Sequence, residues 1–354
     1  MNLTSSRKNA YDLMRLLMAS LVLIQHVGIL GGYGNYLDLG LLSKNQTNIG
    51  EIGVLGFFCL SGYLISSSFV NSKSILKFSL NRILRIFPGF WVCLVITGFI
   101  ISPLIYSELN GSLSGFLFTG KGSALDYVLS NFSTHINIWT PNGVIEKAKY
   151  SISIDGALWS LFPEIICYGF TIILGYFGLF KNKKLFLVLY VFMYSIFAMN
   201  TLKQGCYGPT FIVLLWSTFK RAYIAYLSGI LFYLFEEDFR AEFKELIFAI
   251  IFAFTLFKFG GFNLIAPILM TFIFINLFSK FEFHLKYDIS YGLYIYHFPI
   301  GHLLSSYFSD KSLPPLVFLI LLFITTIPIA FLSFILVEKP FMNLKKYYPS
   351  KFFF

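Results

Sequence analysis

Residues 315–337 read PLVFLILLFITTIPIAFLSFILV and contain no charged side chain. About 20 consecutive apolar residues are enough for one helix to cross a bilayer. This stretch therefore predicts a transmembrane helix. Charge returns directly afterwards in the motif V-E-K-P at residues 337–340, which by itself is typical of a solvated helix end.

The composition extends this expectation to the whole chain. Of its 354 residues, 57% are hydrophobic and 12% are charged, and the mean hydropathy is +0.74. A soluble domain carries about 25% charged residues, so the composition excludes intrinsic disorder and an ordinary soluble enzyme of this length. The net charge is +10, but most Lys and Arg lie in short segments between apolar runs. We therefore interpret the positive charge as a signal of membrane topology, and we expect no nucleic-acid partner.

Further apolar runs are separated by polar breaks in the same way. With the run quoted above, they predict membrane spans at residues 11–30, 49–70, 86–106, 157–180, 185–201, 221–236, 246–260, 264–279, 291–308 and 315–337. The stretch 207–219 is either a half-helix or part of the sixth span, which leaves about nine to eleven spans open.

Lys and Arg gather in the segments that this topology places on the side of the N-terminus. Such a bias marks the cytoplasmic side. We therefore predict an all-α, polytopic helix bundle of about ten transmembrane helices, with both termini cytoplasmic and with membrane lipid around it. It forms a single domain over residues 1–354. The long connection at about 107–155 becomes an extracytoplasmic loop, and we expect no appended soluble domain.

Two ionisable residues share one face of the first predicted span. Arg15 and His26 are separated by eleven positions, which at 100° per residue is about 20° past three full turns. Their separation along the helix is about 16 Å. Ionisable groups inside a span are costly and are functional candidates. The alternative is an arginine that reaches the membrane surface and a histidine bonded to a neighbouring helix.

Two further polar stripes lie in predicted spans. Ser160 and Glu164 are four residues apart and follow Trp159, a residue type that suits the membrane interface. Tyr294 and His297 are three residues apart on a later span. A structural ion pair is the alternative for the carboxylate, which must be paired or protonated at that depth.

Arg82 and Arg85 share a face before the third predicted span, where two guanidinium groups can clamp a phosphate or act as topology anchors. The block FFCLSGYLI at residues 57–65 favours close helix packing, because it combines small and hydroxyl residues. The four cysteines show no paired spacing, so we expect neither a disulfide framework nor a metal site.

Taken together and in this order, the motifs resemble those of the membrane-bound acyltransferase-3 family of bacterial surface-polysaccharide acylases. The resemblance covers nearly the whole chain. It rests on Arg-x10-His at Arg15 and His26, FF-x-L-SGYLI at 57–65, R-x-x-R-x-x-P at 82–88, WSL-x-x-E at 159–164, SY-x-x-Y-x-x-H at 290–297 and the terminal V-E-K-P. Relatives often carry an acidic or amide residue directly after the glutamate. Here Ile165 and Ile166 follow, which leaves the acceptor open.

The resemblance implies a ten-helix acyltransferase in the bacterial inner membrane. It implies acyl-CoA, most often acetyl-CoA, as the donor co-substrate, and no permanently bound cofactor. The acceptor would be a hydroxyl of an envelope polysaccharide such as the O-antigen of lipopolysaccharide, or of a lipid-linked sugar. The enzyme would thus be an O-acetyltransferase.

Within this resemblance, we expect Arg15, Arg82 and Arg85 to hold the CoA phosphates. His26 would act as the general base and Glu164 would orient it. Residues expected to position substrates or polarise the thioester are Ser61, Tyr63, Trp159, Ser160, Tyr294 and His297.

Two other functions are compatible with buried ionisable groups. A transporter or flippase of a lipid-linked sugar also uses intramembrane His and Glu, although we find no paired halves of the kind that many transporters show. A structural subunit without chemistry would leave His26 and Glu164 unexplained. Dependence on acyl-CoA distinguishes the enzyme from both.

Overall fold

The computed structural model describes residues 9–34, 39–40, 42–72, 74–202, 210–309 and 313–346, with backbone only at 210–218. Within these ranges the regular structure is entirely helical, which confirms the all-α prediction. Of the ambiguous stretch 207–219, residues from Thr210 onwards belong to the helix of the sixth predicted span. Residues 207–209 and Cys206 lie outside the described residues.

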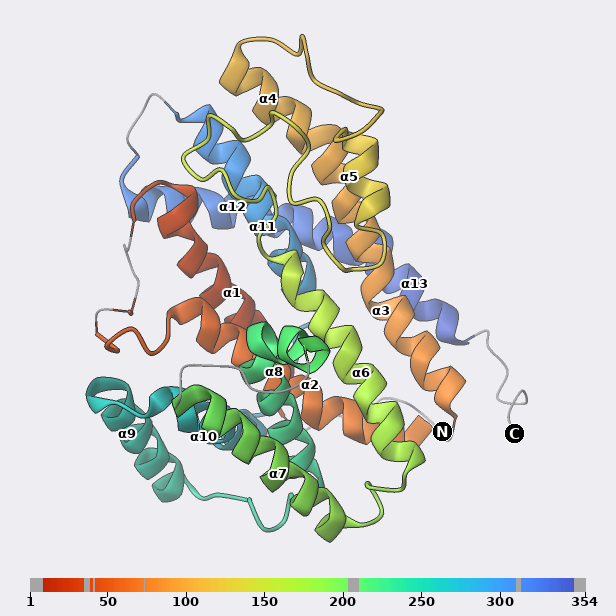
Figure 1. The fold of residues 1–354 in the computed structure, drawn as a ribbon, viewed down its shortest axis with the longest axis vertical. Helices are drawn as coiled ribbons and strands as arrows, with labels where there is room; N and C mark the ends of the chain where they lie inside the picture. The colour runs from red at the N-terminus through yellow and green to blue at the C-terminus, as the bar shows by residue number, and fades with distance from the viewer. Residues whose placement is uncertain are drawn as a thin grey trace. The chain divides into compact units, whose positions relative to one another are not determined.

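Figure 1 shows the helices in chain order. The α-helices are α1 (Tyr11–Leu30), α2 (Ile49–Ser72), α3 (Ile75–Ile96), α4 (Ser102–Asn110), α5 (Ala124–Ser130), α6 (Leu161–Tyr176), α7 (Lys183–Leu202), α8 (Thr210–Leu234), α9 (Phe243–Phe259), α10 (Phe262–Ser279), α11 (Ser290–Tyr307), α12 (Pro315–Ser333) and α13 (Lys339–Asn343). Single π-helical turns are η1 (Thr97–Ile101) and η3 (Phe334–Glu338), and 3-10 turns are η2 (Leu158–Ser160) and η4 (Leu344–Lys346).

In the described part of the chain, 7 helical stretches are long and apolar enough to cross a membrane. They are Tyr11–Leu30, Ile49–Ser72, Ile75–Asn110, Leu158–Tyr176, Lys183–Leu202, Phe262–Ser279 and Pro315–Lys346. The other three predicted spans are helical as well, in α8, α9 and α11. The count of ten spans and the orientation of the termini stay predictions.

By their internal contacts, the residues form two compact units, and each unit is assembled from three separate segments. The first unit comprises Met1–Met18, Leu39–Phe78 and Pro163–Lys286, and the second comprises Ala19–Asp38, Ser79–Phe162 and Tyr287–Phe354. Helices α1, α3 and α6 therefore contribute residues to both units. The prediction of a single domain is not tested by this division.

Two glycines allow helices α2 and α8 of the first unit to pack closely. A methyl group at Gly62 of α2 would overlap the backbone carbonyl oxygen of Tyr226 in α8. A methyl group at Gly229 of α8 would in turn overlap the carbonyl oxygen of Cys59. Small residues allow helix backbones to approach in this way. The packing role that we predicted for the block at 57–65 is thus confirmed at Gly62.

The third membrane stretch begins earlier than we predicted. We expected it at residue 86, but helix α3 begins at Ile75 and carries Arg82 and Arg85 within it. The amphipathic sequence ILKFSLNRILR continues the helix, since its apolar residues recur at helical spacing. The same stretch passes through the π-helical turn η1 into α4, where the Ser102 hydroxyl donates a 2.7 Å hydrogen bond to the Thr97 carbonyl.

The long connection in the second unit is an ordered segment that contains helix α5. Ser123 caps this helix by accepting a hydrogen bond from the backbone N–H of Asp126. The Asn131 side chain donates a 2.7 Å hydrogen bond to the Ile138 carbonyl, and the Ile154 N–H donates a 2.9 Å hydrogen bond to the Trp139 carbonyl. These bonds hold the end of the connection in place before η2.

We predict that Gly62→Ala destabilises the protein, because the added methyl group overlaps a backbone oxygen that cannot rotate away. Overpacking of this kind typically costs about 1–3 kcal/mol. The melting temperature of the purified protein in detergent should fall. Gly169→Ala on α6 is the matched control, since the added carbon would point into open space. Equal melting temperatures for the two variants would contradict the packing role of Gly62.

Candidate functional site

Two histidines of the second unit meet through their ring nitrogens. Nδ1 of His26, on α1, lies 2.7 Å from Nε2 of His297, on α11. The two ring planes are nearly parallel, 9° apart, and their centroids are 5.0 Å apart, as in a hydrogen bond that joins the rings edge to edge. Nδ1 of His297 lies 3.1 Å from the carbonyl oxygen of Leu293, one turn earlier on the same helix. The site therefore begins with a chain of three hydrogen-bonding groups.

Aromatic contacts extend from this histidine pair to the end of the long connection. The rings of Phe298 and His26 contact each other nearly at right angles, with 4.8 Å between centroids. Phe298 also contacts Tyr150 at 5.8 Å and leaves no room for a side chain at Gly156. The residues just before η2 thus pack beside the pair.

A second buried histidine anchors the same segment. His302 lies on α11, and its Nε2 donates a 2.8 Å hydrogen bond to the carbonyl oxygen of Ser153. Our sequence reasoning missed this residue, although a second histidine within the predicted span 291–308 was a visible signal. Its partner lies in the connection, which explains why no local pattern revealed the contact.

Asp155 is buried beside this segment, outside the candidate membrane stretches. One carboxyl oxygen accepts a 3.2 Å hydrogen bond from the backbone N–H of Ala157, and the other lies 3.8 Å from Sγ of Cys93. Burial raises the pKa of the Asp155 carboxyl well above its usual range, and the Ala157 N–H offsets only part of that rise. This carboxyl is therefore neutral over a wider pH range than an exposed aspartate.

Two of the predicted substrate-positioning residues contact each other. The Ser160 hydroxyl, at the end of η2, lies 2.7 Å from the Tyr294 hydroxyl on α11. The Tyr294 ring is 6.2 Å from that of His297. Trp159 precedes this pair and is partly buried. The polar stripe predicted on residues 290–297 therefore faces both His26 and the turn that carries Ser160.

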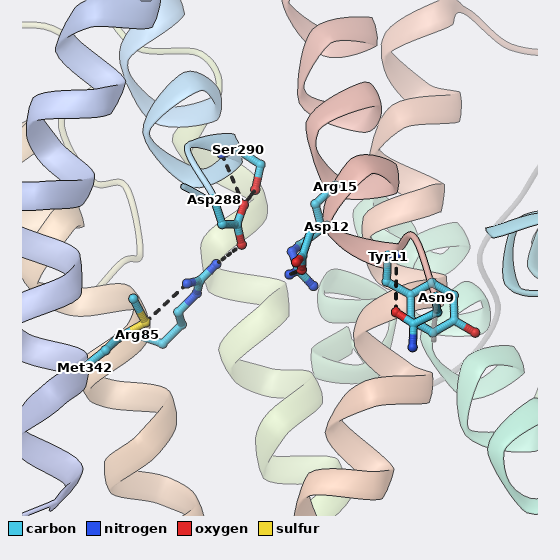
Figure 2. A network of polar contacts seen from close by, with 8 residues as sticks. All are labelled: Asn9, Tyr11, Asp12, Arg15, Arg85, Asp288, Ser290 and Met342. Atoms are coloured by element: carbon cyan, nitrogen blue, oxygen red, sulfur yellow. Dashed lines mark hydrogen bonds and ion pairs between the residues drawn. The ribbon is translucent and has the colours of Figure 1, made fainter. Parts of the chain in front are cut away.

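Arg85, which we expected to bind phosphate, forms an ion pair in the second unit. Its Nη2 lies 3.0 Å from Oδ2 of Asp288 and its Nη1 lies 3.2 Å from Sδ of Met342; Figure 2 shows these residues. The other carboxyl oxygen of Asp288 accepts a 2.5 Å hydrogen bond from the hydroxyl of Ser290, the first residue of α11. Arg82 lies one turn earlier on α3 and is half-buried. Asp288 was not predicted, because its partner is distant in sequence.

The expectation that Glu338 is exposed to solvent was wrong. The motif V-E-K-P suggested a solvated helix end, but Glu338 is only 1% exposed. Its Oε1 accepts a 3.1 Å hydrogen bond from the Ser333 hydroxyl. The reason is that the last helix does not end at Val337. It continues through the π-helical turn η3 into α13, and this places the glutamate inside the helix.

The remaining predicted site residues belong to the first unit. Figure 2 shows Arg15 paired with Asp12 on the same helix. Tyr63 packs against Tyr11 at 5.8 Å and Tyr233 at 6.2 Å between ring centroids.

Ser61 is partly buried on α2, and Glu164 accepts a hydrogen bond from the Tyr168 hydroxyl one turn later on α6. The roles of the residues in the first unit, including the orientation of His26 by Glu164, stay predictions.

The chain is similar to known proteins over nearly its whole length. The profile of a family described as an acyltransferase domain matches residues 8–335. A protein named O-acetyl transferase from Shigella phage Sf6 is 26% identical over 344 residues, which cover 95% of this chain and 97% of that protein. Nodulation protein 10 of Rhizobium leguminosarum bv. viciae is 29% identical over 175 residues, which cover 47% of this chain and 43% of that protein. No solved structure gives a significant match.

The buried bond between Ser160 and Tyr294 predicts non-additive stability effects. Ser160→Ala and Tyr294→Phe each remove one partner, and each should lower the free energy of unfolding by about 1 kcal/mol. The double variant should lose less than the sum, because the two residues share one interaction. Melting temperatures of the purified variants test this. Tyr176→Phe is the control, since Tyr176 is 77% exposed. Fully additive losses would count against the bond.

Proposed function

Because the chain belongs to the acyltransferase-3 family, which matches residues 8–335, we propose that it is an integral-membrane O-acetyltransferase. It moves an acetyl group from cytoplasmic acetyl-CoA to a hydroxyl of a cell-envelope glycan such as O-antigen, in the bacterial inner membrane. The name of the phage relative, O-acetyl transferase, supports both acetyl as the group and oxygen as the acceptor atom. The family match favours this function over a transporter of lipid-linked sugars.

The observation that carries the proposal is the position of His26. It lies on a helix whose cytoplasmic end, in the predicted topology, carries Arg15, and its ring is held by His297. The rise of about 16 Å between Arg15 and His26 is comparable to the length of an extended pantetheine arm. CoA phosphates held at the inner rim would therefore let the thioester reach His26.

In the reaction we propose, His26 accepts the proton of the acceptor hydroxyl as the oxygen attacks the thioester carbonyl. The C–O bond forms, the C–S bond breaks, and the CoA sulfur receives the proton from the imidazolium. The products are the acetyl ester and CoA–SH. In the alternative, an enzyme nucleophile first bonds to the acetyl carbon as the C–S bond breaks, and the acceptor oxygen then displaces that nucleophile.

The second unit supplies three candidate contacts for the reactants. The Tyr294 hydroxyl, bonded to Ser160, can donate to the thioester carbonyl as negative charge develops there. Arg82 and Arg85 can bind phosphate, with Arg85 oriented by the Asp288 carboxylate. Together they describe a donor site at the start of α11 and a reacting centre further along the same helix.

The primary prediction is that His26→Ala abolishes acetylation of the envelope glycan. General-base catalysis contributes about 10²–10⁴ in rate, so the loss should bring acetylation to background. Mass spectrometry of envelope polysaccharides would compare cells that contain the gene, lack it, or carry the variant. An acetyl-sized mass on one sugar should disappear in the last two.

The matched control is His135→Ala, because His135 is exposed in the long connection, where it bonds to Asn137 and its ring lies 5.0 Å from that of Phe162 between centroids. Its acetylation should equal that of the wild type. A normally produced His26→Ala protein with wild-type acetylation would falsify the role of His26. Loss of glycan export, with unchanged acetylation per sugar, would favour the transporter.

A second prediction concerns the donor. Arg85→Gln should raise the KM for acetyl-CoA about tenfold and change kcat little, since a charged hydrogen bond to phosphate contributes about 1.5–3 kcal/mol. Transfer of labelled acetyl from acetyl-CoA in inside-out membrane vesicles measures both constants. Lys181→Gln, which removes an exposed lysine, should leave the KM unchanged.

Asp288→Asn distinguishes phosphate binding from a purely structural ion pair. If Arg85 binds phosphate, Asp288→Asn should raise the KM less than Arg85→Gln does, because the guanidinium is still present. Equal defects in both variants, together with equal falls in melting temperature, would mean that Arg85 acts only through the ion pair.

A further inference from the structure

We propose that His297 is a positioning residue that holds His26 in the tautomer with an unprotonated Nε2. This inference rests on the proposed function, in which His26 is the general base. It differs from the role first expected of His297, which was to contact the thioester or the acceptor directly. Three features of the second unit carry it: the direction of the hydrogen-bond chain, the burial of His297 and the fixed orientation of the rings.

The donor–acceptor direction along these hydrogen bonds is set by the contact between His297 and Leu293. A carbonyl oxygen only accepts hydrogen bonds, so Nδ1 of His297 carries the proton in its 3.1 Å contact with Leu293. A neutral imidazole has one N–H, so Nε2 of His297 is then an acceptor. Its partner at 2.7 Å, Nδ1 of His26, must therefore be the donor. The remaining nitrogen of His26, Nε2, holds a lone pair and can take a proton.

The contacts of His297 indicate that it acts on His26 and not directly on a substrate. Both ring nitrogens are engaged, one by Leu293 and the other by His26, and the side chain is fully buried. No ring nitrogen is left to contact a thioester or a sugar hydroxyl. His297 therefore acts through its neighbour.

The contacts of the His26 ring restrict its orientation as well as its tautomer. Its plane lies 9° from that of His297, while the ring of Phe298 contacts it at an angle of 76° between planes. A base held in one orientation loses less entropy on the way to the transition state. When His26 becomes an imidazolium, its Nδ1–H donates a stronger, charge-assisted bond to His297.

The test compares His297→Gln with His297→Leu in membranes that contain equal amounts of protein. The Gln carbonyl oxygen can accept from Nδ1–H of His26 at roughly the position of the lost nitrogen, whereas Leu cannot. In the Leu variant kcat should fall about 10²–10⁴-fold, the range of a lost base or a wrong tautomer. The KM for acetyl-CoA should not change, and His297→Gln should retain at least about tenfold more activity than His297→Leu.

His302→Gln is the matched control. It lies on the same helix with similar burial, but it bonds to Ser153 and not to His26. Its kcat should stay close to that of the wild type. If His297→Leu does not accumulate, His297→Asn takes its place, because the shorter amide cannot reach Nδ1 of His26. A Gln variant more active than the Asn variant then supports the proposal.

Two results overturn the inference. One is wild-type kcat in His297→Leu, or in His297→Asn if that variant is used. The other is an equal loss in His297→Gln and the non-accepting variant at normal protein levels, which would assign His297 a chemical role that only imidazole fills. His26→Ala is measured in parallel. If that variant is active, the proposed function fails, and this outcome is separate from both results above.

Discussion

A polar group removed from water must find its hydrogen-bond partner within the protein. This constraint is strictest for helices apolar enough to lie in a membrane, where an unpaired group costs several kcal/mol. The second unit meets it with pairs: His26 with His297, and Ser160 with Tyr294. The same pairs form the candidate site. The partners that form hydrogen bonds with these buried polar groups also determine which nitrogen carries a proton and where each hydroxyl points.

Helix α11 is the element on which these pairs converge. Its first turn is tied to Arg85 through Asp288, its middle carries Tyr294 and His297, and its later part is bonded to the long connection by His302. A single helix thus links a basic group suited to phosphate with the proposed base. Placing a site on such an element holds its groups more precisely than a loop would.

Much of this organisation could be predicted. Each predicted span contains a helix within the described residues, and the motifs that resemble the acyltransferase-3 family are supported by a family match over residues 8–335. The errors occur at helix ends. Ile75 begins a helix expected at residue 86, and Glu338 is buried inside one expected to end before it. Hydropathy detects apolar length, but it does not detect an amphipathic turn or a π-helical turn that extends a helix beyond the apolar run.

The sequence by itself determined the helical class, the apolar stretches and the polar residues that do not suit them. These depend on local periodicity and on transfer from water, which neighbouring residues decide. Only the tertiary structure decided which polar residues pair. His26 and His297 are separated by 271 positions, and Arg85 and Asp288 by 203. No local rule connects such residues, because their contact arises only when helices from distant parts of the chain pack and exclude water between them.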